Sequence, residues 1–154
     1  NKLDKIITSG GAAPKIGVIT TGKSYTDVRQ AMEELGIDEV KANELGLRLY
    51  KVAMPYPMDV QGLERFAEGL DLIIVVEEKR ALIEPQLKDA LYGMAHPPVV
   101  EGKQDSTGAK LFRSNAALDP NEIAVAIARR ILAYVDDPQL RERLAEQERS
   151  GRGP

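Results

Sequence analysis

The sequence predicts an α/β fold, a three-layer sandwich in which helices cover both faces of a mostly parallel sheet of about five strands. Three observations support this fold class. β-branched apolar runs alternate along the chain with segments of helical periodicity. The run "LIIVV" is apolar at every position, as is typical of a strand buried on both faces. Gly and Pro residues separate the segments.

The first half of the chain supplies two predicted strands and three predicted helices. Residues 15–21 are mostly β-branched and follow a Gly/Pro-rich entry, which predicts a strand. The helix over 24–36 has apolar residues at helical spacing, and Ser24 and Asp27 resemble a capping box at its start. The remaining elements are a short helix over 38–46 that ends at Gly46, a strand over 47–54 and a helix over 59–70 capped by Asp59.

The second half repeats the alternation and ends in a charged tail. The apolar strand over 72–78 precedes a helix over 82–93, whose Pro85 is tolerated only in its first turn. A short strand over 98–102 and a polar loop with a weak strand at 110–113 follow. Asp119, Pro120 and Glu122 form a helix start, and the helix over 119–135 buries a stripe that includes Ile127.

We therefore divide the chain into a flexible N-terminal segment over 1–14, an α/β domain over 15–135 and a charged helical tail and linker over 136–154. The strands over 15–21, 47–54 and 72–78 have the clearest patterns, and we expect them to be neighbours. A short antiparallel strand is expected at one edge of the sheet.

Composition excludes several classes of protein. With 154 residues, of which 43% are hydrophobic and 29% charged, the chain has the balance of one soluble globular domain. Its net charge of −3 gives no reason to expect nucleic acid, and no basic cluster is dense enough to suggest it. The absence of cysteine excludes disulfides, thiolate metal sites and iron–sulfur ligation within the chain. No apolar run approaches the roughly 20 residues of a membrane helix, and a start without Met indicates a piece of a longer protein.

The stretch "GVITTGKS", residues 17–24, matches the phosphate-loop pattern G-x-x-x-x-G-K-[ST]. A phosphate loop needs open backbone between its two glycines. Here the intervening residues 18–21 are all β-branched and belong to the predicted strand. We therefore interpret Gly22 to Ser24 as a turn from a strand into a helix, and a nucleotide site is the alternative interpretation.

Three loops follow the carboxyl ends of the predicted parallel strands, where ligands and partners of such sheets bind. We expect them to form an interface or ligand rim without a catalytic residue or a metal site. Glu77 and Glu78 are expected to cap a helix or to contact a neighbouring domain. The candidate residues of this rim are Thr21, Gly22, Lys23, Ser24, Tyr25, Pro55, Tyr56, Glu77, Glu78, Lys79 and Arg80.

Three stretches together resemble one enzyme family: "KIGVITTGKSYTDVRQAM", "LYKVAMPYPMD" and "IIVVEEKRALIEPQLKDALY". They are similar to indolepyruvate:ferredoxin oxidoreductase, in the fused form that carries both subunits. The resemblance covers residues 15–135 and is to the middle domain of that enzyme, which is related to the C-terminal domain of transketolase. The combination of "EEKRALIEPQLK" with "GKSYTDVRQA" is its specific part.

The resemblance implies a large cytoplasmic enzyme that uses thiamine diphosphate, magnesium and 4Fe-4S clusters. Such an enzyme oxidatively decarboxylates indolepyruvate and other aryl 2-oxoacids to acyl-CoA and passes the electrons to ferredoxin. The present chain lacks the cluster cysteines and the G-D-G-type magnesium–diphosphate motif. We therefore expect no cofactor in this chain and no activity of the chain alone.

The implied role is that of a non-catalytic structural and assembly domain, packed against the neighbouring thiamine-binding domains of the same enzyme. Ferredoxin and CoA would be partners of the parent enzyme. Two other classes stay open: a small nucleotide-binding domain that uses "GVITTGKS", and a generic α/β module that binds a ligand or a protein.

Overall fold

A five-stranded sheet forms the centre of the computed structural model, which describes residues 5–11, 13–53, 58–78, 81–103 and 119–151. The strands lie in the order β1-β3-β2-β4-β5. Strands β2 to β5 are parallel, and β1 pairs antiparallel with β3 at one edge. Their bounds are Lys5–Ser9 for β1, Ile16–Thr21 for β2, Leu47–Val52 for β3, Leu72–Val76 for β4 and Val99–Glu101 for β5.

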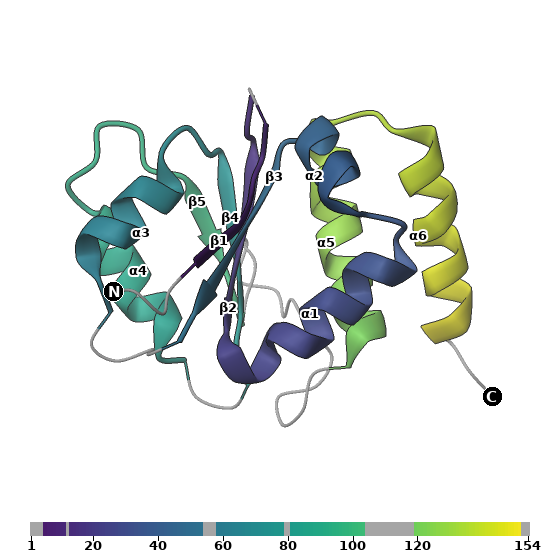
Figure 1. The fold of residues 1–154 in the computed structure, drawn as a ribbon, viewed down its shortest axis with the longest axis horizontal. Helices are drawn as coiled ribbons and strands as arrows, with labels where there is room; N and C mark the ends of the chain where they lie inside the picture. Colours follow the sequence, from purple (N-terminus) through teal and green to yellow (C-terminus); the bar gives the residue numbers. More distant parts are fainter. Residues whose placement is uncertain (1–4, 12, 54–57, 79–80, 104–118, 152–154) are drawn as a thin grey trace.

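Helices cover both faces of this sheet, which confirms the predicted three-layer α/β sandwich (Figure 1). Helices α3 and α4 lie on one face, and α1, α2 and α5 lie on the other, with α6 outside α5. The helix bounds are Gly22–Glu34 for α1, Glu39–Leu45 for α2, Val60–Ala67 for α3, Ile83–Leu91 for α4, Pro120–Tyr134 for α5 and Pro138–Gly151 for α6.

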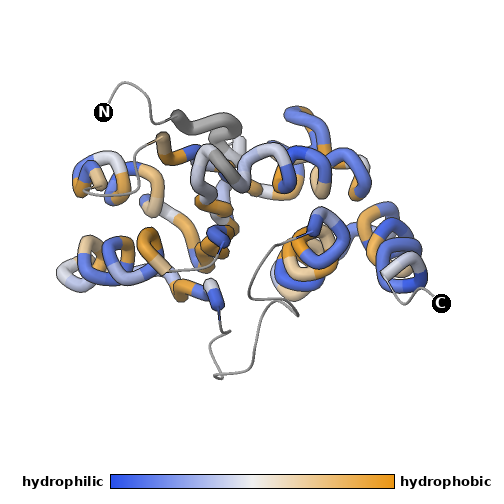
Figure 2. Tube along the Cα trace, turned by 90° about the horizontal axis from the view of Figure 1, so that it is seen from below, coloured by the Kyte–Doolittle hydropathy of each residue, from blue (hydrophilic) through white to orange (hydrophobic). Residues whose placement is uncertain are grey.

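Each face of the sheet has its own hydrophobic core. Alternate residues of β2 and β4 point to opposite faces, and every residue of β4 is buried. Figure 2 shows helical turns that are hydrophobic toward the sheet and hydrophilic outside, whereas α6 is hydrophilic over most of its surface. The sheet therefore supplies the floor of both cores, and the helices close them.

Gly17 in β2 is required by the close approach of α3 and the turn that follows it. A Cβ atom at this position would lie 2.5 Å from Cδ1 of Leu70 and 2.6 Å from Cζ of Phe66. Phe66 also packs on the ring of Tyr50, with 5.0 Å between the ring centroids. Arg48 of β3 donates a hydrogen bond to the carbonyl of Phe66 at 2.6 Å, so a cation lies at the C-terminal end of α3.

Helix α6 is docked on the rest of the molecule through a carboxylate with two partners. Oδ2 of Asp137 accepts a hydrogen bond from the amide of Leu140 at 2.9 Å, and Oδ1 accepts one from Nζ of Lys41 in α2 at 2.8 Å. These bonds lower the pKa of Asp137, the Lys41 hydrogen bond being the main cause. Leu140 is buried in the core under α5. The predicted charged tail is therefore a packed helix over most of its length.

The structure differs from the sequence-based expectation at the N-terminus. The sequence predicts a flexible segment over 1–14, yet residues 5–9 form β1, whose Cα partners on β3 run from Lys51 back to Arg48. A register irregularity separates Ile6 and Thr8, so the alternation that identifies a strand is interrupted there. The expected antiparallel edge strand is present. The weak strand predicted at 110–113 lies outside the described residues.

The other predicted elements are confirmed, with shifts at their ends. The strands over 15–21, 47–54 and 72–78 correspond to β2, β3 and β4, which are neighbours as expected. The short helix α2 ends at Gly46, whose φ of 74° is the left-handed conformation that favours glycine. No helix in the described part of the chain is both long and apolar enough to cross a membrane.

Replacing Ile127 by Ala should strongly lower the unfolding midpoint. The Ile127 side chain is fully buried where α5 packs on the sheet, and truncation of such a residue costs about 2–5 kcal/mol. Chemical denaturation monitored by circular dichroism measures the loss. Glu146→Ala, at an exposed position of α6, is the control and should change little. Equal small effects would mean that α5 is not docked on the sheet.

Candidate functional site

The predicted rim lies at the carboxyl ends of β2 and β4, where the strand order changes direction. From β2 the chain proceeds to β3 on one side, and β4 and β5 are added on the other side. In open parallel sheets such a reversal leaves a crevice outside the strand ends. The segments that follow β2 and β4 begin at Gly22 and Glu77. The fold therefore places the candidate residues that follow β2, beginning at Thr21 and Gly22, next to those that follow β4, Glu77 and Glu78.

The turn after β2 is not a phosphate loop. Gly17 and residues 18–21 lie within β2, and α1 begins directly at Gly22. Oγ1 of Thr21 accepts a hydrogen bond from the amide of Ser24 at 3.1 Å, so Thr21 caps the helix. The expectation that Ser24 is the N-cap is therefore wrong, because the N-cap lies three residues earlier, at Thr21. Ser24 is fully buried, and its Oγ has no hydrogen-bond partner among the described residues.

Tyr25, the next residue of α1, contacts two cationic side chains. Nζ of Lys51, on β3, is 4.6 Å from the centroid of the Tyr25 ring. The guanidinium carbon of Arg29 is 5.7 Å from the same centroid, and Nη1 of Arg29 donates a hydrogen bond to the Tyr25 hydroxyl at 2.9 Å. Cation–π contacts of this kind hold the two cations near one ring. This side of α1 is therefore positively charged.

Glu77 caps α4 from the end of β4. Its carboxylate accepts hydrogen bonds from the amides of Leu82 at 2.9 Å, of Ile83 at 2.9 and 3.1 Å, and of Glu84 at 3.1 Å. The first amides of a helix have no partner within the helix, and the next residue, Pro85, has no amide hydrogen. Glu77 is 4% exposed. Glu77 therefore caps the N-terminus of α4, which is one of the two roles expected for it from the sequence.

The same corner ties β5 to α4. Oε1 of Glu84 accepts a hydrogen bond from the amide of Lys103 at 3.2 Å, and its Oε2 pairs with Nζ of Lys88 at 2.9 Å. The Lys103 ammonium donates a hydrogen bond to the backbone carbonyl of Glu77. This network holds the chain that leaves β5 against the start of α4, so one half of the rim is built on paired charges.

Three carboxylates from three elements approach one another in the other half of the rim. Asp27 lies on α1, Glu78 follows β4, and Asp119 caps α5 by accepting a hydrogen bond from the amide of Glu122 at 2.9 Å. Burial raises the pKa of Asp27, and the negative charges of Glu78 and Asp119 raise this pKa further. The ionised form of Asp27 is therefore disfavoured in the folded chain.

The structure thus places several of the predicted rim residues in distinct roles. Thr21 and Gly22 begin α1, Tyr25 holds cations, Glu77 is buried and Glu78 is half-buried. Sequence reasoning did not identify the association of Asp27 and Asp119 with Glu78, because no spacing in the chain signals that α1 and α5 are neighbours. The side chain of Lys23 and all of Pro55, Tyr56, Lys79 and Arg80 lie outside the described part of the chain.

Replacing Glu77 by Ala should destabilise the fold more than any neighbouring surface substitution. It leaves the amides of Leu82, Ile83 and Glu84 without an acceptor, and each buried unpaired group costs about 1–3 kcal/mol. We expect a loss of at least about 2 kcal/mol in urea unfolding, with a smaller loss for Glu77→Gln, which keeps one acceptor oxygen. Glu78→Ala is the matched control. A loss for Glu78→Ala as large as that for Glu77→Ala would contradict the capping role.

Replacing Asp27 by Asn should raise the melting temperature at pH 7. Because the pKa of Asp27 is raised on folding, the folded chain holds this proton more tightly than the unfolded chain. Its ionisation therefore costs stability as the pH rises through the folded pKa, and Asn removes that cost. The advantage should vanish well below about pH 4, the ordinary range of an Asp pKa, where both states are protonated.

Differential scanning fluorimetry across pH measures the Asp27→Asn effect. Glu33→Gln, at an exposed position of the same helix, is the control and should show no such pH dependence. A stabilisation that is the same at pH 3 and pH 7 would refute the electrostatic explanation.

Comparison with protein families identifies the chain through most of its length. Residues 6–152 match the family model described as "Indolepyruvate oxidoreductase domain". The subunit IorA of indolepyruvate oxidoreductase from Pyrococcus abyssi is 38% identical over 74 residues, which are 48% of this chain and 10% of IorA. IorA from Thermococcus kodakarensis is 33% identical over 89 residues, which are 58% of this chain and 13% of that protein.

Two solved structures, a ferredoxin oxidoreductase and a transketolase, have the same fold. A 2-oxoglutarate:ferredoxin oxidoreductase from Magnetococcus marinus, solved with 2-oxoglutarate, coenzyme A and succinyl-CoA bound, superposes with a TM-score of 0.56 at 20% identity. The match covers 85% of this chain and 20% of that one. A split-gene transketolase, described as an inactive beta4 tetramer, gives a TM-score of 0.54 at 13% identity over 83% of this chain and 41% of its own.

These likenesses support the transketolase C-terminal-like fold that the sequence predicts. The chain spans only about a tenth of the length of the IorA proteins from Pyrococcus abyssi and Thermococcus kodakarensis. Because the family model matches nearly all of the described chain, the chain belongs to the indolepyruvate oxidoreductase domain family.

Proposed function

We propose that this chain is the non-catalytic assembly domain of a thiamine-diphosphate-dependent indolepyruvate:ferredoxin oxidoreductase. The observation that carries the proposal is the family match over residues 6–152, combined with the small share of the IorA proteins that the chain covers. The parent enzyme would oxidatively decarboxylate aryl 2-oxoacids to acyl-CoA in the cytoplasm. Ferredoxin would receive the electrons, and CoA would accept the acyl group.

The described residues of the rim do not fit the diphosphate of thiamine diphosphate. Asp27, Glu78 and Asp119 bring negative charge to the rim, and like charges at close range repel, so these side chains do not favour a diphosphate beside them. No group of three or more His, Cys, Asp or Glu residues in the described segments is arranged to hold a metal ion. We therefore assign the cofactors of the parent enzyme to its other domains and no catalytic step to this chain.

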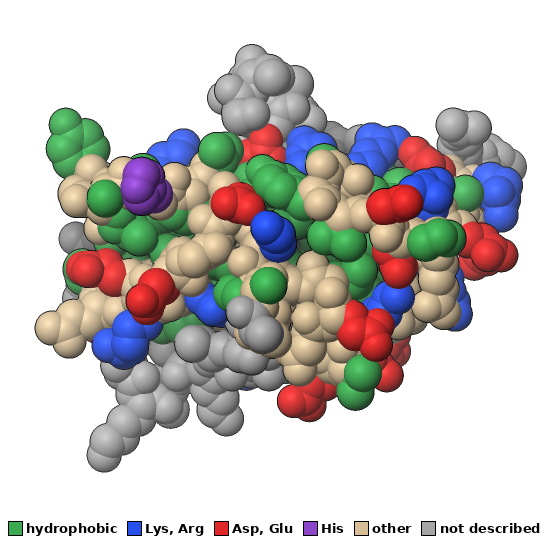
Figure 3. Space-filling view, turned by 90° about the horizontal axis from the view of Figure 1, so that it is seen from above, with side chains coloured by type: hydrophobic (Ala, Val, Ile, Leu, Met, Phe, Trp, Pro, Cys, Tyr) green, Lys and Arg blue, Asp and Glu red, His purple; other side chains and the backbone are tan. Residues whose placement is uncertain are grey.

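The rim is the surface that we assign to the neighbouring thiamine-binding domains. Burial raises the pKa of Asp27, and the negative charges of Glu78 and Asp119 raise this pKa further, so an ionised Asp27 is unfavourable in the chain alone. A neighbouring domain that brings cations to this group would relieve the repulsion, and charge complementarity would set the orientation of the two domains. By contrast, the opposite face, at the amino ends of the parallel strands, mixes both signs of charge among apolar and neutral side chains (Figure 3).

Charge reversal at the rim should separate assembly from folding. Glu78→Lys and Arg80→Glu should leave the isolated chain folded, because Glu78 is only half-buried and both are charged residues of the segment that follows β4. In the full-length enzyme the same changes should weaken the association of domains or subunits and reduce turnover. Size-exclusion chromatography, melting curves and 2-oxoacid-dependent ferredoxin reduction measure these effects. Glu146→Lys on α6 is the control for charge alone.

Two outcomes would contradict the assembly role of the rim. One is unfolding of the isolated chain by Glu78→Lys while the full-length enzyme tolerates the change, which would make the rim an internal structural network. The other is normal assembly and turnover with both reversals present.

The nucleotide-binding alternative has no support in the geometry. The variable positions of "GVITTGKS" lie in β2, where residues 18–20 are buried and their amides belong to the sheet. We therefore keep the assembly domain as the one proposed function.

A further inference from the structure

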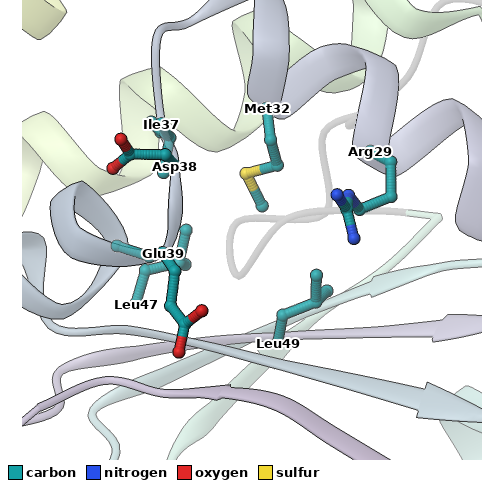
Figure 4. A pocket seen from close by; sticks show the side chains of 8 residues that line it. Arg29, Met32, Ile37, Asp38, Glu39, Leu47 and Leu49 are labelled. Atoms are coloured by element: carbon teal, nitrogen blue, oxygen red, sulfur yellow. The ribbon is translucent and has the colours of Figure 1, made fainter.

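A pocket outside the rim lies over β3, between α1 and α2. Its volume is about 140 Å³. Side chains from α1, from the turn that precedes α2, from α2 itself and from β3 surround it (Figure 4). Its apolar lining consists of Met32, Ile37, Ala42, Leu47 and Leu49. Cavities of about 150 Å³ with apolar walls hold a benzene-sized molecule. The pocket therefore has room for a group about the size of a benzene ring.

A cation lies at the α1 side of this pocket. Figure 4 shows the Arg29 guanidinium turned toward the space above Leu49. The hydrogen bond from its Nη1 to the Tyr25 hydroxyl leaves its other nitrogens available. Lys51 lies on the same Tyr25 ring. Within the described segments neither Arg29 nor Lys51 forms an ion pair, so this end of the pocket has a positive charge that favours a carboxylate.

An anion lies at the α2 side. The Glu39 carboxylate extends from the first residue of α2 along the pocket wall, toward the strands (Figure 4). The neighbouring Asp38 has a structural role: its Oδ1 caps α2 by accepting a hydrogen bond from the amide of Lys41 at 2.8 Å. Among the residues that the structure describes, Glu39 has no ion-pair partner. The pocket therefore presents opposite charges from opposite walls above one apolar floor.

We propose that this pocket binds a free hydrophobic α-amino acid with a side chain about the size of that of phenylalanine. Its carboxylate pairs with Arg29, its ammonium pairs with Glu39, and its side chain covers Met32, Leu47 and Leu49. The site lies away from the rim and does not depend on the proposed assembly role. It makes the domain a sensor of amino acids, and Tyr25 is a positioning residue that orients the Arg29 guanidinium.

The charge pattern also predicts what the pocket rejects. A 2-oxoacid with the same side chain keeps the carboxylate but has a keto oxygen where the amino acid has its ammonium. Glu39 then faces an oxygen acceptor, and neither group can donate a hydrogen bond to the other. A site that pairs with a polar group discriminates against an analogue that lacks it, although less strongly where, as at Glu39, the group of the site is exposed. Glu39 is therefore the residue that distinguishes the amino acid from the corresponding 2-oxoacid.

Titration of the 154-residue chain with L-phenylalanine tests the proposal. We expect saturable binding by calorimetry with a dissociation constant on the order of 1 mM, given the small contact area. Proton–carbon spectra should show shifts of the Met32, Leu47 and Leu49 methyl groups. 3-Phenylpropionate, phenethylamine and phenylpyruvate should each bind about tenfold or more weakly, because each lacks one charged hydrogen-bonding group.

Substitutions at the two walls provide the second arm. Arg29→Gln and Glu39→Gln should each weaken L-phenylalanine about tenfold or more, and Ala42→Met should fill the pocket and abolish binding. Glu33→Gln and Arg149→Gln, at exposed positions outside the pocket lining, are the matched controls and should not change it. A melting curve of each variant confirms that it is folded.

Several results would overturn the proposal. They are no saturable binding of L-phenylalanine, binding that leaves the Met32 and Leu49 methyl groups unshifted, equal affinity for 3-phenylpropionate, and unchanged affinity in folded Arg29→Gln and Glu39→Gln. Absence of binding would point instead to a pocket that a side chain of a neighbouring protein covers.

Discussion

Burial of both faces of β2 and β4 is the constraint on which the rest of the structure depends. Residues 16–20 of β2 and all of β4 are buried, and each strand pairs on both sides. Strands buried on both faces must be covered by helices above and below, and parallel neighbours require crossover connections. The three layers, the alternation of strand and helix, and the convergence of loops at one rim all follow from this requirement.

The first amides and the last carbonyls of a helix have no partner within the helix. In this domain, side chains from neighbouring elements form hydrogen bonds with several of them. Glu77 at the end of β4 accepts the first amides of α4, and Arg48 of β3 donates to the last carbonyls of α3. Asp137 caps α6 while it pairs with Lys41 of α2. Each of these groups has the sign of charge that complements the helix dipole. The charges of this domain therefore orient helices as well as keep the surface hydrated.

The remaining charges are arranged in two different ways on two surfaces. At the rim, Asp27, Glu78 and Asp119 have the same sign of charge, and burial together with the charges of Glu78 and Asp119 raises the pKa of Asp27. Beside α1 and α2, Arg29 and Glu39 have opposite signs on opposite walls of an apolar pocket. A surface of one sign suits a macromolecular neighbour of the other sign, whereas a small pocket with both signs suits a zwitterion. Each feature takes one residue from α1, Asp27 at the rim and Arg29 at the pocket.

What the sequence determined by itself is the fold class, the family and nearly every element. Periodicity and capping chemistry are local, so α2 with Gly46 and α5 with Asp119 could be located from neighbouring residues alone. The phosphate-loop match could also be rejected locally, because residues 18–21 are β-branched. Only the tertiary structure decided that residues 5–9 form a strand, since an edge strand with an irregular register takes its pairing from β3.

The tertiary structure also decided what the candidate residues do. Glu77 and Glu78 are adjacent and chemically equivalent in the sequence, yet one is buried on the amides of α4 and the other faces Asp27. Arg29 and Glu39 are ten positions apart on separate helices, and no pattern joins them. Their shared pocket exists because α1 and α2 both pack on β3. Local chemistry specifies elements, whereas the partners of a side chain depend on which elements long-range packing brings together.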